Sequence, residues 1–269
     1  MQLIRDIASL DRFKSDDLVI SEDEWIKNDL ERELKRKGYL NEEDGYNCEE
    51  CNNRGYIPVI LDGNIVYRYC KCRKIRKSIK LLKESGLGDS IKTIAEYEAV
   101  EKWQLDIKSK AISFLKQDIA RCFYIGGQTG AGKTHICSGI ANEYIFKGVP
   151  TMYVMWVSMI ERLKNFKDES RNEYGRQICD IDVLYIDDFF KPDSTKAEYS
   201  RTDIIKTFEI IDRRYKQPGK ITLISSELKI NELAAVDEAT AGRIIEMAGI
   251  YGIDIERDNG KNYRLRKNK

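Results

Sequence analysis

A chain of 269 residues is long for one compact domain and suggests roughly two. Its apolar content of 42% excludes a wholly disordered protein, because that fraction is enough to build a packed core. Charged residues make up 34% of the chain, but a net charge of +1 does not indicate the charge of any partner.

The beginning of the chain and its apolar runs predict neither a secretory leader nor a membrane span. Charged side chains occur within the first six positions, and the longest apolar run, TMYVMWVSMI at 151–160, is about half the length that a bilayer requires. We therefore expect a cytoplasmic protein with no membrane association. Thiols stay reduced there, so the seven cysteines favour metal ligands or buried thiols over disulfides.

Charge is distributed unevenly along the N-terminal part of the chain. Residues 1–47 hold 13 acidic and 8 basic side chains, whereas residues 68–83 hold eight basic side chains and no acidic one. Such a basic run can attract DNA phosphates or an acidic protein surface, or it can be the solvated face of a helix. The sequence leaves these alternatives open.

The N-terminal part predicts a helix, a hairpin and a second helix. Ile26, Leu30 and Leu34 recur every four residues in a helix expected at 22–37. The segments YIPVI and NIVYRY read as two strands joined by a turn at Asp62-Gly63. The basic stretch that follows has helical spacing up to Gly86.

A helical region around 95–120 leads into the second half, and from residue 122 onward apolar strands alternate with helical patterns. This alternation predicts a parallel sheet covered by helices on both faces, an α/β fold. The last residues alternate around Asp258-Asn259-Gly260 and predict a short hairpin. The expected strands are 122–126, 151–156, 182–187 and 221–225, and the expected helices are 95–120, 133–147, 157–167 and 197–216.

The segment GGQTGAGKT carries the pattern of a phosphate-binding loop between a strand and a helix. Its glycines, among them Gly127, Gly130 and Gly132, let backbone N–H groups point at phosphate oxygens. Lys133 can reach the β- and γ-phosphates of ATP, and Thr134 can offer its hydroxyl to Mg²⁺. The segment therefore predicts an ATP site.

A second candidate nucleotide-binding element, VLYIDDFF, places Asp187 and Asp188 at the end of an apolar strand. Ligands of open α/β sheets bind at that end. We expect Asp187 to hold Mg²⁺ and Asp188 to orient or deprotonate the attacking water. The alternative is that the two aspartates only cap the end of the strand and have no role in catalysis.

Two further polar features carry weaker signals. Ser225 and Ser226 end the strand ITLIS and could sense the γ-phosphate, although serines are common at strand ends. Arg243 lies in the helical segment TAGRIIEM. It forms either a surface salt bridge or an arginine finger that completes the ATP site of a neighbouring subunit.

Four cysteines near the predicted hairpin have the spacing of a zinc site. Cys48 and Cys51 are spaced C-x₂-C, and Cys70 and Cys72 are spaced C-x-C. Four thiolates from two short turns can make a closed tetrahedral Zn²⁺ site, and so small a segment needs a metal to fold. A redox pair is the alternative, but no thioredoxin-like βαβ unit surrounds it. The remaining cysteines, Cys122, Cys137 and Cys179, are expected in the core.

Several of these motifs together resemble a known family. FYIGGQTGAGKTHI, LYIDDF, ISSEL, DEATAGRI and NYR occur in the order and spacing of AAA+ replicative helicase loaders, with the closest likeness to DnaC/DnaI-type loaders of phages and mobile elements. The upstream CEECNNRGYI and YCKC resemble the cysteine-bearing N-terminal region of that group. The likeness covers most of residues 48–265.

The resemblance implies an AAA+ P-loop core with a reduced lid, preceded by a small α plus zinc-binding domain. By position, it places Ser226 in the sensor-1 region, Arg243 at the arginine finger and Arg264 at a sensor-2-like position. Glu227 stands where many relatives have Asn. The implied domains are 1–95, which contacts the helicase and contains the zinc segment 48–72, and 96–269, the ATPase.

The implied function is ATP-dependent loading of the replicative hexameric helicase onto single-stranded DNA, with self-association of ATP-bound subunits. The implied cofactors are ATP, Mg²⁺ and Zn²⁺. Three alternatives stay open: an IstB-type transposition-accessory ATPase, a DnaA-type initiator, and a non-hydrolysing zinc adaptor. The lack of a helix-turn-helix pattern after residue 250 counts against the initiator.

Overall fold

The computed structural model describes residues 22–88, 92–165, 168–191 and 199–263. The chain divides into two compact units, Met1–Arg76 and Lys77–Lys269, which we call the N-terminal and the C-terminal unit. This division concerns packing alone, so the functional boundary expected near residue 95 stays a prediction.

The N-terminal unit contains the predicted helix and hairpin. The turn between the strands has Asp62 at φ 49° and Gly63 at φ 72°, the positive values that a two-residue type I′ turn requires. The strands are antiparallel, with Leu61 paired to Asn64 next to the turn. The elements are α2 (Glu22–Lys35), α3 (Leu40–Asp44), β1 (Tyr56–Leu61), β2 (Asn64–Tyr69) and the first residues of α4 (Cys72–Ser85).

The core of the N-terminal unit is small and consists mainly of thiols. Its buried residues are Cys48, Cys51, Ile57, Cys70 and Cys72, with Tyr46 and Val59 packed against them. Burial of so few apolar side chains stabilises a fold weakly, and small domains of this kind usually need a metal or disulfides. The composition of this core therefore agrees with the zinc site that the cysteine spacing predicts.

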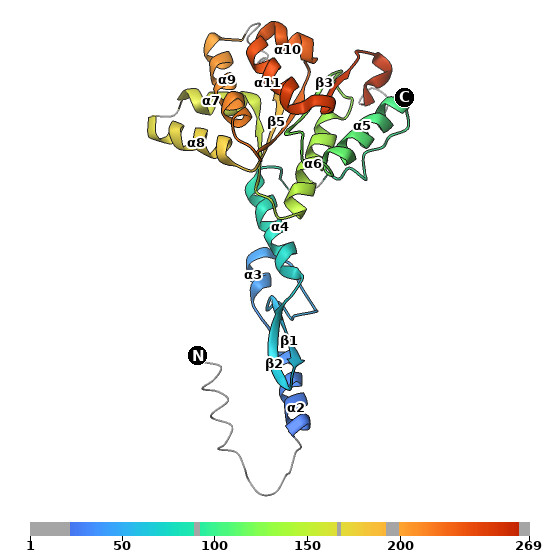
Figure 1. The fold of residues 1–269 in the computed structure, drawn as a ribbon, viewed down its shortest axis with the longest axis vertical. Coiled ribbons are helices and arrows are strands. Elements are labelled where there is room, and N and C mark those ends of the chain that lie inside the picture. Colours follow the sequence, from blue (N-terminus) through green and yellow to red (C-terminus); the bar gives the residue numbers. More distant parts are fainter. Residues whose placement is uncertain (1–21, 89–91, 166–167, 192–198, 264–269) are drawn as a thin grey trace, which may run out of the picture. The chain divides into compact units, whose positions relative to one another are not determined.

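The C-terminal unit is built on a parallel sheet, as the strand–helix alternation predicts. Among the described residues the sheet has five strands in the order β4-β5-β6-β3-β7, and each neighbouring pair is parallel (Figure 1). The strands are β3 (Cys122–Gly127), β4 (Thr151–Met155), β5 (Val183–Phe189), β6 (Ile221–Ser226) and β7 (Gly252–Ile255).

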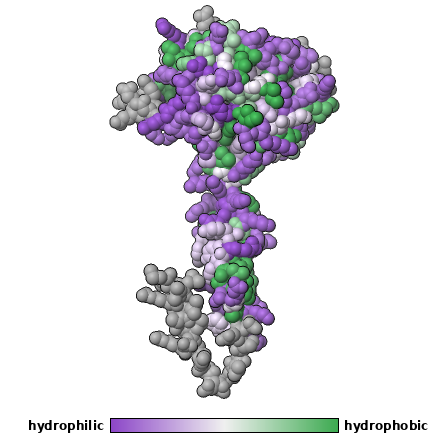
Figure 2. Space-filling view, viewed as in Figure 1, coloured by the Kyte–Doolittle hydropathy of each residue, from purple (hydrophilic) through white to green (hydrophobic). Residues whose placement is uncertain are grey.

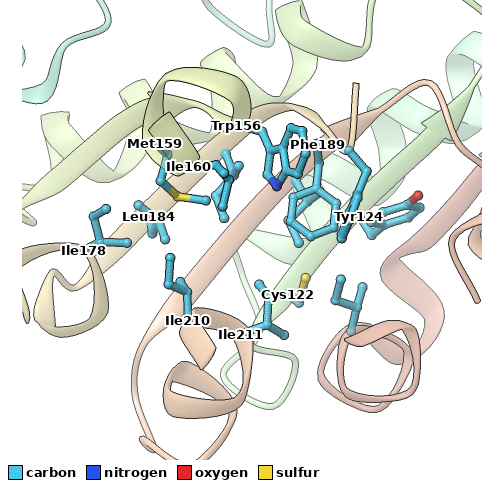
Figure 3. Close-up of a cluster of buried hydrophobic side chains, with 14 of the residues drawn as sticks. Cys122, Tyr124, Trp156, Met159, Ile160, Ile178, Leu184, Phe189, Ile210 and Ile211 are labelled. Atoms are coloured by element: carbon cyan, nitrogen blue, oxygen red, sulfur yellow. The ribbon is translucent and has the colours of Figure 1, made fainter. Parts of the chain in front are cut away.

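Helices cover both faces of this sheet (Figure 1). Successive residues of β3 face opposite layers: Tyr124 packs with the cluster under α7 to α11, and Phe123 packs with the cluster under α5 and α6. Figure 3 shows part of the first cluster. The helices are α5 (Lys102–Phe114), α6 (Lys133–Phe146), α7 (Trp156–Asn165), α8 (Asp168–Asp180), α9 (Arg201–Tyr215), α10 (Ile230–Val236) and α11 (Glu238–Ala248).

The surface of the C-terminal unit is mixed in character. On the face shown in Figure 2, hydrophilic residues predominate and apolar ones are scattered among them, as is normal for a globular domain. Within the described part of the chain, none of the helices combines the length and the apolar character that crossing a bilayer requires.

Several parts of the C-terminal unit differ from the prediction. Helix α10 lies in a segment for which no element is predicted, and α5 begins at Lys102 and not near residue 95. Helix α8 was not expected, because its sequence DESRNEYGRQICD contains few apolar residues to mark a helical face. Strand β7 pairs in parallel with β3, whereas the sequence predicts pairing with the segment after Gly260. The described part of that segment forms the 3₁₀ turn η3 (Asn259–Lys261), and residues 264–267 of the expected hairpin lie outside the described residues.

Candidate nucleotide site and cysteine cluster

The phosphate-binding loop connects β3 to α6. Gly127, Gly130 and Gly132 have φ values of 105°, 75° and 82°, which residues with a side chain rarely adopt. A Cβ on Gly127 would also lie 2.0 Å from the carbonyl oxygen of Ile255, so glycine is required there. These three glycines produce the curled loop that the motif predicts.

Lys133, the first residue of α6, is buried against the loop. Its Nζ donates hydrogen bonds to the carbonyl oxygens of Gly127 (2.9 Å) and Gln128 (2.8 Å). Burial lowers the pKa of Lys133, although Glu227 and nearby acids oppose the shift. Both described hydrogen bonds of Lys133 Nζ go to backbone carbonyl oxygens. Phosphate oxygens can replace these carbonyls as acceptors.

Asp187 is buried at the end of β5 and receives three hydroxyl groups. Thr134 Oγ1 lies 3.1 Å from Asp187 Oδ1, the Tyr153 hydroxyl lies 3.3 Å from Oδ2, and Ser225 donates to Oδ1. A carboxylate beside the P-loop threonine supplies the oxygen ligands that Mg²⁺ prefers. These residues therefore fit a Mg²⁺–nucleotide site.

Asp188 follows in β5 and is more accessible than Asp187. It has a φ of 50°, and its Oδ2 accepts a 3.1 Å hydrogen bond from Lys191 Nζ. Both Asp188 and Lys191 line the same cavity as Lys133. Asp188 therefore shares a cavity with the P-loop lysine, and its role as general base stays a prediction.

The cavity next to the loop has a volume of about 570 Å³, within the usual range for small-molecule sites. Lys133, Thr134 and the two aspartates line it. Aromatic residues line it as well, and aromatic rings can stack on the flat face of a nucleotide base. These aromatic residues are Tyr97, Trp103 and Tyr263.

The aromatic part of the cavity was not predicted from the sequence. Tyr263 is held there by its N–H, which donates to Gly130 O at 2.9 Å, and by its hydroxyl, which donates to Glu98. Lys261 Nζ lies 5.7 Å from the centre of the Trp103 ring. The NYR segment was the one sequence signal that marked this region.

The two serines at the end of β6 have different surroundings. Ser225 donates to Asp187, as described above, whereas the Ser226 hydroxyl donates to Phe189 O at 2.7 Å and accepts from the Leu228 N–H at 3.0 Å. Ser225 therefore has the direct contact with the acidic residue. The sensor role assigned to Ser226 stays a prediction.

Arg243 lies on α11 and pairs within its own chain. Its Nε donates to Asp212 Oδ1 at 2.7 Å, and its guanidinium lies 4.5 Å from the centre of the Phe208 ring. It does not line the cavity of its own chain. An arginine finger acts on a neighbouring subunit, so that role of Arg243 stays a prediction. Arg264 lies outside the described residues, and its sensor-2-like role also stays a prediction.

The four cysteines of the N-terminal unit converge, as their spacing predicts. The sulfur atoms of Cys48, Cys51, Cys70 and Cys72 all lie within 4.8 Å of one another. The Cys48–Cys70 and Cys51–Cys72 sulfur distances are 3.8 and 3.5 Å. Four thiolates about 2.3 Å from Zn²⁺ in a tetrahedron are about 3.8 Å apart, so the cluster fits zinc. The remaining three cysteines are buried in the C-terminal unit, as expected.

The fold, the loop and the acidic strand end together define a P-loop ATP-binding protein of the AAA+ class. The sequence model of the IstB-like ATP binding protein family matches residues 55–269, and the chain belongs to this family. This confirms the IstB/DnaC-like AAA+ resemblance that the motifs indicate.

The individual relatives include a protein of a phage-like element and a replicative helicase loader. The chain is 30% identical over 242 residues to the phage-like element PBSX protein XkdC of Bacillus subtilis (strain 168), covering 82% of this chain and 85% of that protein. It is 26% identical to the replicative helicase loader DnaI of the same strain, covering 80% and 76%. The solved DnaC helicase loader matches with a TM-score of 0.51 and 20% identity, over 62% of this chain and 97% of that one, which shows the shared fold.

Proposed function

We propose that the protein is an ATP-dependent loader that places a replicative hexameric helicase on single-stranded DNA. One observation carries the proposal: a complete P-loop site occurs in a chain 26% identical to the loader DnaI over 76% of that protein's length. ATP-bound subunits associate, engage DNA and helicase, and release them after hydrolysis.

The residues of the C-terminal unit supply the ATPase chemistry. The loop N–H groups and Lys133 bind the phosphates of ATP, and Thr134 with Asp187 binds Mg²⁺. A Mg²⁺ ion held by these residues would neutralise charge that develops on the phosphates. Asp188 accepts a proton from the attacking water, and Arg243 of one subunit completes the site of the next.

The N-terminal part, residues 1–95, contacts the helicase in this proposal. Zinc bound by the four cysteines stabilises segment 48–72, which has a small core of its own. The basic residues of 68–83 contribute positive charge to either a DNA or a protein contact.

A capture experiment tests the partner. Tagged protein, mixed with the replicative helicase of the organism that encodes it, should retain the helicase with AMPPNP and Mg²⁺ and lose most of it with ADP. The Lys133→Ala variant should retain little in either state. Equal retention of the helicase by wild type and by Lys133→Ala, or none by either, would contradict ATP-switched loading.

A transposition-accessory ATPase is the second candidate, because the matching family is described as IstB-like. Such a protein would engage a transposase and duplex DNA. ATP turnover measured with equal nucleotide concentrations of single-stranded and duplex DNA separates the two: stimulation by single strands favours the loader, and stimulation by duplex favours transposition. A protein that binds zinc but hydrolyses no ATP would be the non-hydrolysing adaptor.

A further inference from the structure

Lys191 follows β5 and contacts two carboxylates in the nucleotide cavity. Its Nζ lies 3.1 Å from Asp188 Oδ2 and 3.3 Å from Glu227 Oε1. Its backbone N–H donates to Asp188 O at 3.0 Å, which closes a tight turn. Lys191 and Glu227 line the same cavity as Lys133. Two ammonium groups from different elements therefore face one cavity.

The turn that carries Lys191 is strained and firmly anchored. Asp188 and Phe190 have φ values of 50° and 52°, and residues with side chains adopt such values at a cost that surrounding structure must offset. Phe190 is buried, stacks on Trp156 at 4.9 Å, and its carbonyl accepts a 2.5 Å hydrogen bond from the Tyr199 hydroxyl. Figure 3 shows Phe189 and Trp156 in this cluster.

Packing of Phe190 consequently fixes the backbone of the turn, and the two ion pairs direct the Lys191 side chain. Backbone strain held in place by a buried aromatic cluster is typical of functional sites. The turn delivers Asp188 and Lys191 to one side of the cavity, and Glu227 reaches them from the segment after β6.

The charges that line the cavity also favour a role for Lys191 in binding phosphate. The cavity is lined by five acidic side chains and four lysines, which are Glu96, Glu98, Asp187, Asp188 and Glu227, and Lys92, Lys133, Lys191 and Lys261. A triphosphate adds further negative charge, so removal of the Lys191 ammonium lowers the attraction of the cavity for ATP. Partial burial lowers the pKa of Lys191, but Asp188 and Glu227 outweigh it and raise the pKa overall, which keeps the side chain charged.

Glu227 connects Lys191 to the phosphate loop. Burial raises the pKa of Glu227, but Lys191, Thr129 of the loop and Lys133 together have the larger opposite effect. The pKa of Glu227 is therefore below its ordinary value, and the carboxylate is ionised. The acid here has a cationic partner, Lys191, and the two residues form one charged unit beside the loop.

We propose that Lys191 is a further phosphate-binding residue of the ATPase site: its ammonium contacts the terminal phosphate of ATP, and Asp188 and Glu227 hold it there. The inference rests on the ATP hydrolysis proposed above. In that hydrolysis the water oxygen bonds to the terminal phosphorus, the bond to the ADP oxygen breaks, and Asp188 takes the water proton.

A comparison of two nucleotides tests this contact. Affinities for fluorescent AMPPNP and ADP, with Mg²⁺, are measured for wild type, Lys191→Gln, Lys191→Arg and Lys206→Gln. Lys206 is the matched control, because it also pairs with an acid three residues away (Glu209, 2.7 Å) and does not line the nucleotide cavity. Lys191→Gln should weaken AMPPNP binding about 10- to 100-fold, the range for a charged hydrogen bond, and change ADP binding less than about twofold.

The remaining variants and outcomes separate this proposal from the wider one. Lys191→Arg should keep most of the preference for AMPPNP, and Lys206→Gln should match wild type. Equal weakening of both nucleotides by Lys191→Gln, or no weakening, overturns the phosphate contact while leaving the ATPase proposal intact. Wild-type protein that binds neither nucleotide overturns both. Helicase capture is read separately, so failure to find a helicase partner does not affect this measurement.

Discussion

Thr134 Oγ1 donates a 3.1 Å hydrogen bond to Asp187 Oδ1 and so joins the first turn of α6 to the carboxyl end of β5. The two residues are 53 positions apart in the chain. Their contact shows that the loop and the acidic strand end form one site, the arrangement needed to hold a Mg²⁺ ion beside phosphates. Asp188, the next residue, points to Lys191 instead.

The two neighbouring aspartates should therefore give different defects. Asp187→Asn should weaken Mg²⁺-dependent ATP binding by at least about 10-fold, because a charged hydrogen-bonding ligand is lost. Asp188→Asn should keep ATP binding and lower kcat about 10²- to 10⁴-fold, the usual contribution of a general base. Nucleotide titration with and without EDTA, together with phosphate release, measures both effects. Normal turnover by Asp188→Asn would show that another residue activates the water.

Metal removal should unfold the N-terminal unit and loosen helix α4, which begins at the ligand Cys72. Purified protein should contain about one Zn²⁺ per chain by elemental analysis, and Cys72→Ser should release it, because a structural site needs all four ligands. Hydrogen exchange should then rise across residues 48–85. Cys179→Ser is the control, since this thiol is buried in the C-terminal unit. Absence of zinc in freshly purified wild-type protein would contradict the site.

Local sequence patterns predicted those parts of the site that lie in one continuous segment. The loop from Gly127 to Thr134 is one such segment, and the cysteine pairs are separated by a single hairpin whose turn, Asp62-Gly63, is itself recognisable. In each case the backbone geometry is determined by nearby residues, so spacing alone is informative.

The other parts of the site depend on tertiary packing, and among them only the NYR segment carries a sequence signal. The aromatic lining of the cavity joins Tyr97 and Trp103, which are close in the chain, to the distant Tyr263. Lys191 is adjacent to Asp188, but its second partner, Glu227, follows a different strand. Helix α8 has too few apolar residues for its sequence to predict a helix, so the helix depends on the surface against which it packs.

Arg214 should be essential for stability although it is far from any proposed chemistry. It is fully buried, burial lowers its pKa to about 10, and its guanidinium donates five hydrogen bonds. Arg214→Met should destabilise the fold by about 3–5 kcal/mol, because buried acceptors lose their donors. Those acceptors are Thr222 Oγ1 and the carbonyl oxygens of Ile178, Cys179, Ile181 and Ile221.

The adjacent arginine provides the control for this measurement. Arg213 forms an exposed 3.0 Å ion pair with Asp180, and pairs of this kind contribute about 0–1 kcal/mol. Urea unfolding of Arg213→Met and Arg214→Met should therefore differ by at least about 2 kcal/mol. Similar free energies of unfolding for the two variants would show that the buried network adds little.

Asp203 should make the stability of α9 depend on pH. The Asp203 carboxylate accepts a 2.9 Å hydrogen bond from the Ser200 N–H and pairs with Lys164. Burial raises the pKa of Asp203, but these partners have the larger opposite effect, so the pKa is lowered overall. A depressed carboxyl pKa stabilises the fold above the unfolded value of about 4, and this contribution is lost as pH falls through the folded value. Asp203→Asn should therefore cost about 1 kcal/mol at pH 7, and the difference should shrink below about pH 4.

Urea unfolding at pH 7, 5 and 3 measures this dependence. Glu209→Gln, which removes a half-exposed acid paired with Lys206 on the same helix, should show little change at any of the three values. A constant difference between wild type and Asp203→Asn from pH 7 to pH 3 would mean that the charge of Asp203 does not matter.

Arg243 should act on a neighbouring subunit, and mixing two inactive variants tests this directly. Arg243→Ala should bind ATP normally but hydrolyse it slowly, and Lys133→Ala should not bind ATP. When the two are mixed, Lys133→Ala subunits supply the arginine to Arg243→Ala sites, so activity should return. Because Arg243 also pairs with Asp212 at 2.7 Å, the Asp212→Ala variant controls for loss of that contact. If the mixture stays inactive while gel filtration with AMPPNP shows mixed assemblies, Arg243 does not complete a neighbour's site.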